Sequence, residues 1–532
     1  MSWQQLISEF TSQRRAIEAG GGPKAVERQH SKGRLSARER IHALLDDQAS
    51  WLEIGMWGAF GMYEEWGGAI SASVICGVGS ISERQVMIIA NDATIKAGAF
   101  FPMTCKKVLR AQRVAMQCRL PLLYLVDSAG VFLPLQDEIF PDEDDFGRIF
   151  RNNAVISAMG IPQIAAIMGN CVAGGGYLPV LCDKLVMTEG SGLYLAGPAL
   201  VKSAIGQEVS HEDLGGAEMH ASISGTIDYR EKDDQAAIER VKRLMAGLPE
   251  DFRAKQFRRV DYTEQNHQQL ILEKIPVDAQ TRYDVRDLIR LICDPDSFDE
   301  YKAEYGKTIV CGYARIGGFS VGIVANQRTV VTTPKEGMQF GGVIYHDSAD
   351  KEARFIMDCN QTWTPIIFLQ DVMGFMVGRD SEQAGIIRAG AKVVNVISNS
   401  RVPKITVITG GSYGAGNYAM CGKAFDPRFI FAWPNARYAV MGGKQAASTI
   451  IDINIQAMKR LGQDPDAEEL ETLKRKVTDA YDNSEDIRYA AARLWVDDVI
   501  FPHETRHKLI RSLEIVTRHA DPEPFRTGVL QV

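Results

Sequence analysis

The chain has 532 residues, of which 45% are hydrophobic and 24% are charged, and its formal net charge at pH 7 is -7. This composition is typical of a globular protein and excludes a disordered or fibrous one. The acidic balance argues against a nucleic-acid partner, and no apolar run approaches the ~20 residues that a membrane helix needs.

The beginning of the chain and its cysteines indicate the compartment. The first 20 residues carry charges throughout and contain no apolar signal core. The nine cysteines are scattered without any C-x-x-C pair, which argues against a zinc ribbon and against a disulfide framework. We therefore expect a reducing compartment, the cytoplasm, or the mitochondrial matrix if the chain is a mature eukaryotic protein.

Short apolar runs alternate with helical stretches along the first half of the chain. The runs 86–90, 122–126 and 164–168 have the length of buried strands, and Gly-rich turns follow them. A helical periodicity covers 104–117. Continuous apolar strands that alternate with helices predict an α/β fold with a parallel sheet covered on both faces.

The second half of the chain repeats the first. Residues 160–177 correspond to 401–418 at an offset of 241, and 122–130 correspond to 366–374 at an offset of 244. A third match, 86–91 with 321–326, has an offset of 235. Loop insertions explain such drifts, so we expect a tandem duplication of one domain. The polar stretch from about 230 to 281 is the expected linker, giving domains 1–275 and 276–532.

Two equivalent glycine turns follow the third strand of each repeat. They are Ala173-Gly174-Gly175-Gly176 and Gly414-Ala415-Gly416-Asn417. Ligands of open α/β sheets gather beyond the carboxyl ends of the strands, and glycine lets backbone N–H groups approach a ligand closely. Tight packing is the alternative explanation for a single turn of this kind, and the fixed repeat of two turns favours a ligand site.

A second N–H group is available from the turn after the preceding strand, where Val131 and Phe375 are equivalent. Two convergent N–H groups form an oxyanion hole, and loss of one donor typically costs ~3–4 kcal/mol of barrier. The chain contains no G-x-x-x-x-G-K-[ST] phosphate loop, and neither glycine turn fits the dinucleotide fingerprint.

Several longer stretches resemble the crotonase-type carboxyltransferases, the β subunits of propionyl-, methylcrotonyl- and geranyl-CoA carboxylases. These stretches are Asn91–Lys96, Gln136–Pro141, Ala196–Lys202, Ile205–Ser210, Asp213–Ala217, Gly374–Gly378, Met420–Gly422, Trp433–Arg437 and Ala439–Ala447. The likeness runs from about Arg34 to Arg506 and is greatest to the methylcrotonyl/geranyl branch. It implies a tandem duplication of a crotonase-like domain.

The resemblance also implies a reaction. CO2 moves from carboxybiotin to the α-carbon, or the vinylogous γ-carbon, of an acyl-CoA, and the biotin ureido nitrogen takes the substrate proton. No protein general base is then required, and no Ser/His/Asp arrangement surrounds the glycine turns. We expect the amino-terminal domain to bind the acyl-CoA and the carboxyl-terminal domain to bind biotin.

Individual roles follow by position from the same resemblance. The thioester oxygen would be held by Val131, Gly174 and Gly175, and the biotin urea oxygen by Phe375, Ala415 and Gly416. Neighbouring positions expected to contact these groups are Ala173, Gly176, Gly374, Gly414 and Asn417. Lys106, Lys107 and Arg110 are candidates to bind the CoA phosphates, with solvated helix charges as the alternative. Lys444 is expected to matter structurally or at the biotin site.

The resemblance implies partners as well. The chain has no Met-Lys-Met biotinylation sequence and no ATP-grasp-like segment, so a separate α subunit with biotin carboxylase and biotin carrier domains is expected. Sites of the family form between the amino-terminal domain of one chain and the carboxyl-terminal domain of another. We therefore expect at least a homodimer, and a β6 core within an α6β6 assembly. The four-cysteine zinc ribbon of the bacterial acetyl-CoA enzyme is missing, and no metal is expected.

Three departures from the methylcrotonyl pattern bear on the substrate. They are Ser128-Ala-Gly-Val-Phe132, Ala173-Gly-Gly-Gly-Tyr177 and Arg151 in place of an aromatic residue. These features resemble glutaconyl-CoA decarboxylase α subunits, which run the transfer in reverse. Arg151, with Phe132 and Tyr177, is our hypothesis for a pocket that takes an acyl chain ending in a carboxylate. The alternative is that Arg151 is a surface helix residue.

A rival hypothesis comes from His503-Glu-Thr-Arg-His507, which matches the H-E-x-x-H motif of zinc hydrolases. Two histidines one helical turn apart bind the metal in those enzymes. No persuasive third ligand is evident, and no substrate domain follows the motif. A non-enzymatic scaffold built from the same duplicated fold is a third hypothesis.

Overall fold

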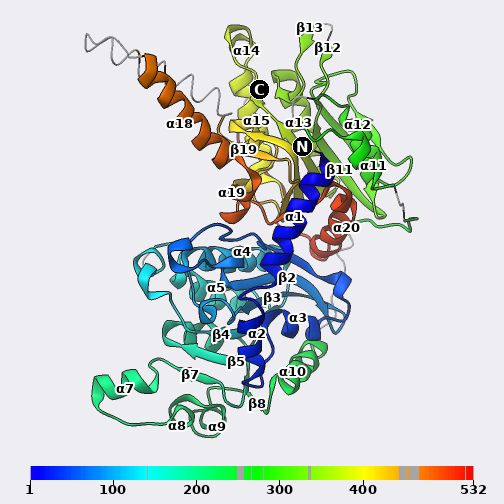
Figure 1. Ribbon diagram of the computed structural model, residues 1–532. Coiled ribbons are helices and arrows are strands. Elements are labelled where there is room, and N and C mark those ends of the chain that lie inside the picture. The colour runs from blue at the N-terminus through cyan, green and yellow to red at the C-terminus, as the bar shows by residue number, and fades with distance from the viewer. Residues whose placement is uncertain are drawn as a thin grey trace. The chain divides into compact units, whose positions relative to one another are not determined.

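A computed structural model describes residues 2–140, 142–248, 257–264, 267–278, 281–333, 337–441, 451, 455, 467–521 and 523–530 (Figure 1). The chain divides into two compact units. The amino-terminal unit is Thr11–Phe252 with Ala491–Asp498, and the carboxyl-terminal unit is Arg253–Ala490 with Met1–Phe10 and Val499–Val532. The boundary at residue 275 remains a prediction, and Pro249, Glu250 and Asp251 of the expected linker lie outside the described residues.

The amino-terminal unit contains an eight-stranded sheet in the order β1-β2-β3-β4-β5-β6-β8, with β7 beside β5. The strands are β1 (Leu52–Ile54), β2 (Val74–Ile81), β3 (Arg84–Asn91), β4 (Leu122–Ser128), β5 (Gln163–Val172), β6 (Lys184–Thr188), β7 (Gly192–Tyr194) and β8 (Tyr229–Glu231). The pairs β1–β2 and β2–β3 are antiparallel, and all later pairs are parallel.

The carboxyl-terminal unit repeats this sheet strand for strand, in the order β20-β18-β17-β15-β11-β10-β9 with β19 beside β17. The strands are β9 (Asp299–Tyr301), β10 (Ile309–Ile316), β11 (Phe319–Asn326), β15 (Ile366–Val372), β17 (Lys404–Tyr413), β18 (Phe429–Ala432), β19 (Arg437–Ala439) and β20 (Asp498–Val499). The antiparallel pairs are again the first two, β9–β10 and β10–β11. The prediction of a duplicated α/β domain is confirmed.

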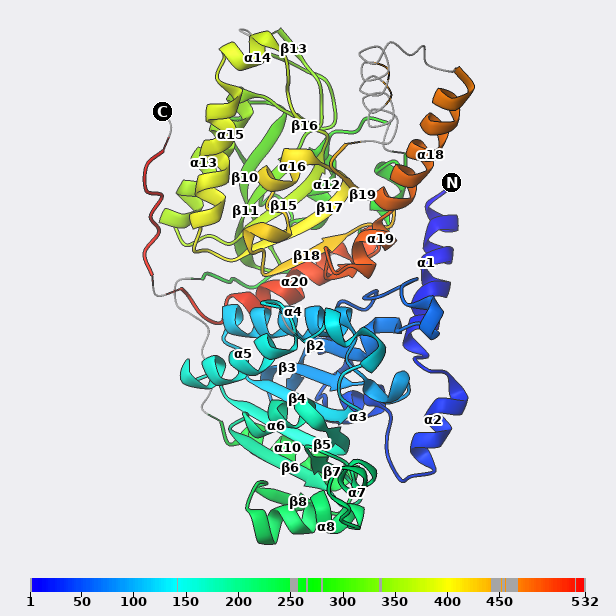
Figure 2. The same cartoon turned by 90° about the vertical axis from the view of Figure 1, so that its left-hand side faces the viewer.

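Helices cover both faces of each sheet because the strands are apolar on both sides. In the amino-terminal unit α3 (Ala37–Leu44) and α10 (Asp234–Ala246) pack on one apolar core with β2 to β6, and α4 (Pro102–Cys118) packs with α5 (Phe146–Ala158). The helix predicted over 104–117 is therefore confirmed as α4. In the carboxyl-terminal unit α13 (His346–Gln361) and α15 (Ile386–Asn399) lie side by side (Figure 2).

The remaining elements are shorter or lie outside the sheets. The helices are α1 (Trp3–Glu18), α2 (Pro23–His30), α6 (Tyr177–Val180), α7 (Pro198–Ile205), α8 (His211–Gly215), α9 (Ala217–Met219), α11 (Leu270–Lys274), α12 (Val285–Ile292), α14 (Arg379–Gln383), α16 (Gly414–Ala419), α18 (Ala467–Glu485), α19 (Ile487–Ala492) and α20 (Thr505–Val516). Four short strands are β12 (Val331–Thr333), β13 (Gly337–Gln339), β14 (Val343–Ile344) and β16 (Gly374–Phe375). Among the described residues, no helix is long and apolar enough to cross a membrane.

Each sheet carries the same irregularity at the end of its central strand. The register of β4 on β5 shifts between Val126 and Ser128, and that of β15 on β17 shifts between Gln370 and Val372. A buried aspartate occupies each irregularity. Asp127 accepts a hydrogen bond from the backbone N–H of Asn170 at 3.2 Å.

Asp371 likewise accepts a hydrogen bond from the backbone N–H of Gly411, at 2.8 Å. A Cβ atom at Gly169 would overlap the carboxylate of Asp127, and a Cβ atom at Gly410 would overlap that of Asp371. Glycine is therefore required on the neighbouring strand in both copies, because the carboxylate takes the place of a side chain.

Each buried carboxylate has an arginine as its counter-ion. Arg40 Nη1 lies 3.4 Å from Asp127 Oδ2, and Arg328 Nε lies 3.2 Å from Asp371 Oδ2. Burial raises the pKa of both aspartates, and the two arginines oppose the shift. A buried pair of this kind is strongly destabilising when one partner is removed.

We predict that Gly169→Ala lowers the free energy of unfolding by about 3 kcal/mol or more, because the new methyl group forces the Asp127 carboxylate out of place. Gly147→Ala is the matched control, since a Cβ atom at this helical position meets nothing within 4 Å. The control should be neutral or stabilising by roughly 0.5–1 kcal/mol. Urea unfolding of both variants measures the difference, and equal stability of the two would contradict the packing argument.

Another buried carboxyl group of the carboxyl-terminal unit has no counter-ion among the described residues. Glu352 of α13 is fully buried, and neither of its carboxyl oxygens has a hydrogen-bond partner among the described residues. Burial raises the pKa of Glu352 well above its usual value. An isolated ionised carboxylate is very costly in an apolar interior, so the neutral acid is the favoured form.

Stability should therefore depend on pH through Glu352. The pKa of Glu352 in the folded state lies above the unfolded value of about 4.3. The folded state is therefore most stable, as far as Glu352 is concerned, below pH ~4.3, and this stability is lost in the window between that pH and the folded-state pKa. We predict that Glu352→Gln gains stability over the unchanged chain as pH rises, by up to ~1.4 kcal/mol per pH unit within that window. Urea unfolding at several pH values measures the difference, with the exposed Glu382→Gln as control. A difference that does not vary with pH would refute this prediction.

Candidate active site

The predicted glycine turn of the amino-terminal unit contacts the turn after β4. The turn forms the 3-10 helix η6 (Ala173–Gly176), which leads from β5 into α6. A Cβ atom at Gly175 would lie 3.8 Å from the Cα of Gly130. Gly130 itself has a φ of 89°, a left-handed conformation that favours glycine. The structure thus brings together the two turns that the sequence analysis selected.

Val131 presents a backbone N–H group with no hydrogen-bond partner among the described residues. It forms a parallel bridge with Phe100, in which the flanking residues make the hydrogen bonds. Phe100 N donates to Gly130 O at 2.8 Å, and Phe132 N donates to Phe100 O at 2.9 Å. In such a parallel bridge the N–H of the residue between the two bonded ones, here Val131, points away from the segment that contains Phe100. A free donor next to the glycine turn is what an oxyanion hole requires.

In the carboxyl-terminal unit the glycine turn also contacts the turn after the preceding strand, β15, and the two turns lie closer together. A Cβ atom at Gly416 would lie 3.1 Å from the Cα of Gly374 and 2.7 Å from Cγ2 of Val372. Gly374 has a φ of 125°, and Phe375 pairs in parallel with Ile344 of β14. Met376 N donates to Ile344 O at 2.8 Å. This bond is the counterpart of the one from Phe132 N to Phe100 O in the amino-terminal unit.

The side chain of Asn417 faces the interior, and a contact of this position with biotin stays a prediction. Its amide nitrogen donates to Ser412 Oγ at 2.8 Å and to Tyr438 OH at 3.0 Å, and the residue is 7% exposed. Tyr438 belongs to β19, so these bonds fix the turn to the strand beside it. In the same turn Ala415 is exposed and Gly414 is half-buried.

Two of the three basic residues expected at the CoA phosphates have internal partners, which corrects that prediction. Lys107 is 1% exposed, and its Nζ donates to the carbonyl oxygen and the hydroxyl of Ser71 at 2.9 and 2.8 Å. Arg110 forms two hydrogen bonds with Asp497, at 2.9 and 2.7 Å. The helical spacing was right, but it placed these residues on the buried face of α4. Lys106 is exposed.

Of the three residues expected around the acyl chain, Tyr177 and Phe132 belong to two different aromatic contacts, and Arg151 is the sequence neighbour of the first. Arg151 is exposed on α5 and forms no hydrogen bond or ion pair with another described residue. Its neighbour Phe150 contacts Tyr177, with ring centroids 6.1 Å apart. Phe132 instead stacks on Phe101 at 4.2 Å. Lys444 lies outside the described residues.

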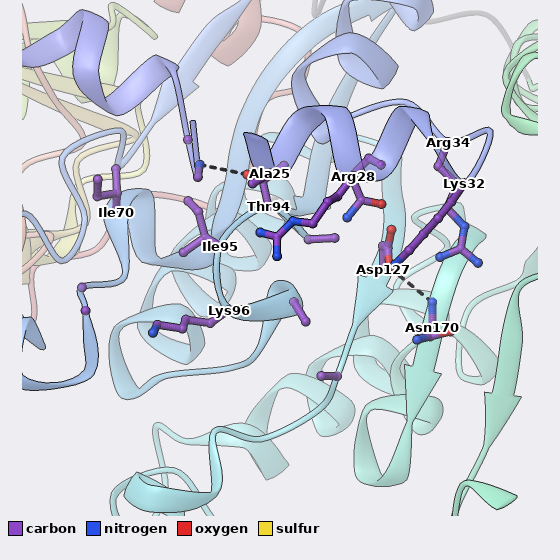
Figure 3. A pocket seen from close by; sticks show the side chains of 18 residues that line it. Ala25, Arg28, Lys32, Arg34, Ile70, Thr94, Ile95, Lys96, Asp127 and Asn170 are labelled. Atoms are coloured by element: carbon purple, nitrogen blue, oxygen red, sulfur yellow. Dashed lines mark hydrogen bonds between the residues drawn. The ribbon is translucent and has the colours of Figure 1, made fainter. Parts of the chain in front are cut away.

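A cavity of about 740 Å³ opens beside the amino-terminal turns (Figure 3). Ala129 lines it directly before Gly130, and Asn170 lines it three residues before the glycine turn. The remaining lining comes from residues 20–34, 67–70 and 93–97, together with Asp127.

Four cationic side chains of the cavity wall were not selected from the sequence. They are Arg28, Lys32, Arg34 and Lys96. The lining contains one carboxylate, Asp127, which shares the buried Arg40 with Asp234. The cavity therefore offers a surplus of positive charge, as phosphate groups require. Their sequence signal was weak, because three of the four precede the first strand and only Lys96 belongs to a stretch that carried the resemblance.

The H-E-x-x-H motif does not form the helical zinc-binding arrangement. His503 and Glu504 lie in the 3-10 helix η9 (Pro502–Glu504), and α20 begins at Thr505. Glu504 Oε2 accepts a hydrogen bond from the backbone N–H of Phe501 at 2.8 Å and so caps the helix. Within the described ranges, no group of three or more His, Cys, Asp or Glu side chains is placed to hold a metal ion.

The sequence matches the family model of the carboxyl transferase domain over residues 28–527. The chain belongs to this family. The mitochondrial methylcrotonoyl-CoA carboxylase β chain of Arabidopsis thaliana is 45% identical over 518 residues, covering 96% of this chain and 85% of the relative. The biotin-dependent 3-methylcrotonyl-CoA carboxylase β1 subunit of Mycobacterium tuberculosis is 42% identical, covering 99% and 97%.

A solved structure agrees over the whole chain. The β subunit of the P. aeruginosa geranyl-CoA carboxylase superposes with a TM-score of 0.86 at 34% identity, covering 99% of this chain and 95% of that one. These comparisons confirm the resemblance drawn from the sequence, including the duplicated crotonase-like fold.

Proposed function

We propose that this chain is the carboxyltransferase subunit of a biotin-dependent acyl-CoA carboxylase, transferring CO2 from carboxybiotin to the α-carbon, or vinylogous γ-carbon, of an acyl-CoA. The observation that carries the proposal is the cationic cavity, whose lining includes Ala129, two residues before the N–H group of Val131. The names of the relatives, methylcrotonyl- and geranyl-CoA carboxylase β subunits, support the same reaction.

The amino-terminal unit is the acyl-CoA side of this proposal. Coenzyme A carries three phosphate groups, and the cavity offers Arg28, Lys32, Arg34 and Lys96 to them. The thioester would then reach the turns, where the N–H groups of Val131 and of Gly174 or Gly175 hold its oxygen. These donors stabilise the negative charge that develops on that oxygen when the neighbouring carbon loses its proton.

The carboxyl-terminal unit is the biotin side. Its turn is surrounded by exposed apolar side chains, among them Met373, Val377 and Val440. Such surroundings fit the neutral, bicyclic biotin better than a phosphorylated ligand, and the backbone N–H groups of Phe375, Ala415 and Gly416 are the proposed donors to its urea oxygen. Biotin, carried on a separate α subunit, supplies the CO2 when it is bound. The residues of this chain orient it and exclude water.

The assembly and location follow from the proposed function. A partner α subunit with biotin carboxylase and biotin carrier domains is needed, because ATP-dependent carboxylation of biotin has to occur elsewhere. A homodimer is the smallest competent unit in this proposal, and an α6β6 assembly is the expected form. The cytoplasm, or the matrix of a mitochondrion, is the expected location.

Three substrate classes fit the proposal: methylcrotonyl-CoA, geranyl-CoA, and glutaconyl-CoA in a decarboxylase that runs in reverse. The unpaired guanidinium of Arg151, next to the Phe150–Tyr177 contact, favours an acyl chain that ends in a carboxylate. If Arg151 has this role, Arg151→Ala lowers kcat/KM for dicarboxylic acyl-CoA esters relative to monocarboxylic ones.

The experiment that tests the function is a substrate panel. The purified chain and its biotinylated partner are given ATP, bicarbonate and acetyl-, propionyl-, 3-methylcrotonyl-, geranyl- and glutaryl-type CoA esters, and glutaconyl-CoA is tested in the reverse direction. Carboxylation of one ester that depends on ATP is the expected result. Failure with every ester in both directions, with an ATP-competent partner, would refute the proposal.

The cavity assignment predicts a binding defect in Arg28→Ala. Losing one charge-assisted bond to a phosphate should raise KM for the acyl-CoA about tenfold, with kcat unchanged because the turns are intact. Steady-state kinetics measure both constants. Arg243→Ala, an exposed cation of α10 that does not line the cavity, is the control and should behave as the unchanged chain. An unchanged KM in Arg28→Ala would contradict the assignment.

The oxyanion hole predicts a different defect in Val131→Pro. Proline removes the free N–H group, so kcat should fall by roughly 10²–10³-fold, while binding of CoA in the cavity is retained. Val131→Ala keeps the N–H group and should retain most activity. Single-turnover carboxylation and a CoA-binding measurement separate the two effects. Comparable rates in the proline and alanine variants would exclude this donor.

A further inference from the structure

Strand β7 supports the acyl-side glycine turn from one edge. It pairs in parallel with residues Asn170–Val172 of β5, which lead directly into Ala173–Gly176. Its side chains also reach the turn, since a Cβ atom at Gly176 would lie 3.3 Å from Cδ1 of the buried Leu193. The position of β7 therefore decides where the turn lies.

Among the described strands β7 pairs with β5 alone, so none of them lies beside its outer edge. Buried carbonyl groups on such an edge need another donor. His220 supplies it, with Nε2 at 2.7 Å from the carbonyl oxygen of Leu193. A carbonyl oxygen only accepts, so Nε2 carries the proton.

The ring of His220 is held from its other side as well. Nδ1 lies 2.8 Å from Ser224 Oγ, which in turn lies 2.8 Å from Thr226 Oγ1. His220 is 9% exposed and begins the π-helix η7 (His220–Ser224). Isolated π-helical turns are uncommon and occur frequently at functional sites. This turn follows α9 directly, and α8 of the same segment packs against β7.

In the carboxyl-terminal unit a side chain also forms a hydrogen bond with the strand that flanks the glycine turn. Its flanking strand β19 pairs with Gly411–Tyr413, the residues before Gly414. Asn417 ties the turn to this strand through the hydroxyl of Tyr438. In each unit a side chain thus forms a hydrogen bond with the strand that flanks the glycine turn. Asn417 does so from within the turn, and His220 does so from η7, outside the turn.

We propose that His220 is a positioning residue for the acyl-CoA side of the transfer. Its Nε2–H···O bond to Leu193 fixes β7 and thereby holds the turn Ala173–Gly176 in register with Val131. This inference rests on the proposed function of that turn as an oxyanion hole. His220 does not line the phosphate cavity, so it acts on the rate of the reaction and not on the binding of coenzyme A.

The test compares His220→Asn with His220→Gln in the complete enzyme. The amide nitrogen of glutamine reaches the position of Nε2 and can donate to Leu193, whereas asparagine ends near the position of Nδ1. His220→Asn should lower kcat about tenfold or more, as expected for an unsatisfied buried carbonyl, with KM for the acyl-CoA within twofold of the unchanged chain. His220→Gln should restore kcat to within about threefold. Full activity of His220→Asn, or an equal loss in both variants, would overturn the proposal.

A second measurement does not depend on activity. Hydrogen exchange of the peptide spanning residues 171–181, followed by mass spectrometry, should be faster in His220→Asn and unchanged in His220→Gln. Ser224→Ala, which loosens the ring more mildly, should give a smaller increase and serves if the asparagine variant does not fold. Ser222→Ala is the control, because its hydroxyl binds Glu218 O in the same segment. Unchanged exchange in both His220→Asn and Ser224→Ala would refute positioning by His220.

The two proposals fail in distinguishable ways. An unmodified enzyme that carboxylates no acyl-CoA contradicts the proposed function, whereas the exchange rates still decide whether His220 holds the turn.

Discussion

The glycine turns depend on a buried aspartate at the end of the central strand of each sheet. Asp127 and Asp371 accept backbone hydrogen bonds from the neighbouring strand at the point where the strand register shifts. The carboxylate leaves no room for a side chain on that strand, and an arginine neutralises it. The two turns beyond the shift are thereby brought into contact. One electrostatic and steric constraint, used twice, builds both candidate holes.

The side chains around the two turns of the duplicated scaffold differ, which in the proposed function gives the two turns different ligands. The amino-terminal turn adjoins a cavity with four cations, and the carboxyl-terminal turn is surrounded by exposed apolar side chains. Backbone N–H groups serve any oxygen that carries or develops negative charge. In the proposed function the surroundings therefore decide what each turn binds, a phosphorylated thioester on one side and a neutral ring system on the other. The strands that flank the turns, held by His220 and by Asn417, preserve the geometry in both cases.

The corrections share one physical cause. Lys107 and Arg110 were chosen because they lie at helical spacing with Lys106, yet α4 buries the face that carries the first two. Their side chains donate hydrogen bonds to Ser71 and Asp497, which are distant in the sequence. Periodicity shows which residues share a face of a helix, but not whether that face meets solvent, the sheet or a ligand.

The sequence by itself determined the duplication, the strand–turn–helix order and the two glycine turns, because hydrophobic period and glycine position are local properties that repeat along the chain. The family followed from the same stretches. The phosphate cavity was decided only by the tertiary structure, since Arg28 and Lys96 come from segments that meet in space without any common sequence pattern. The free amide of Val131 likewise depends on a bridge to Phe100, and the bond from His220 to Leu193 spans 27 residues. Contacts of this range are fixed by the packing of the whole unit, which no local pattern encodes.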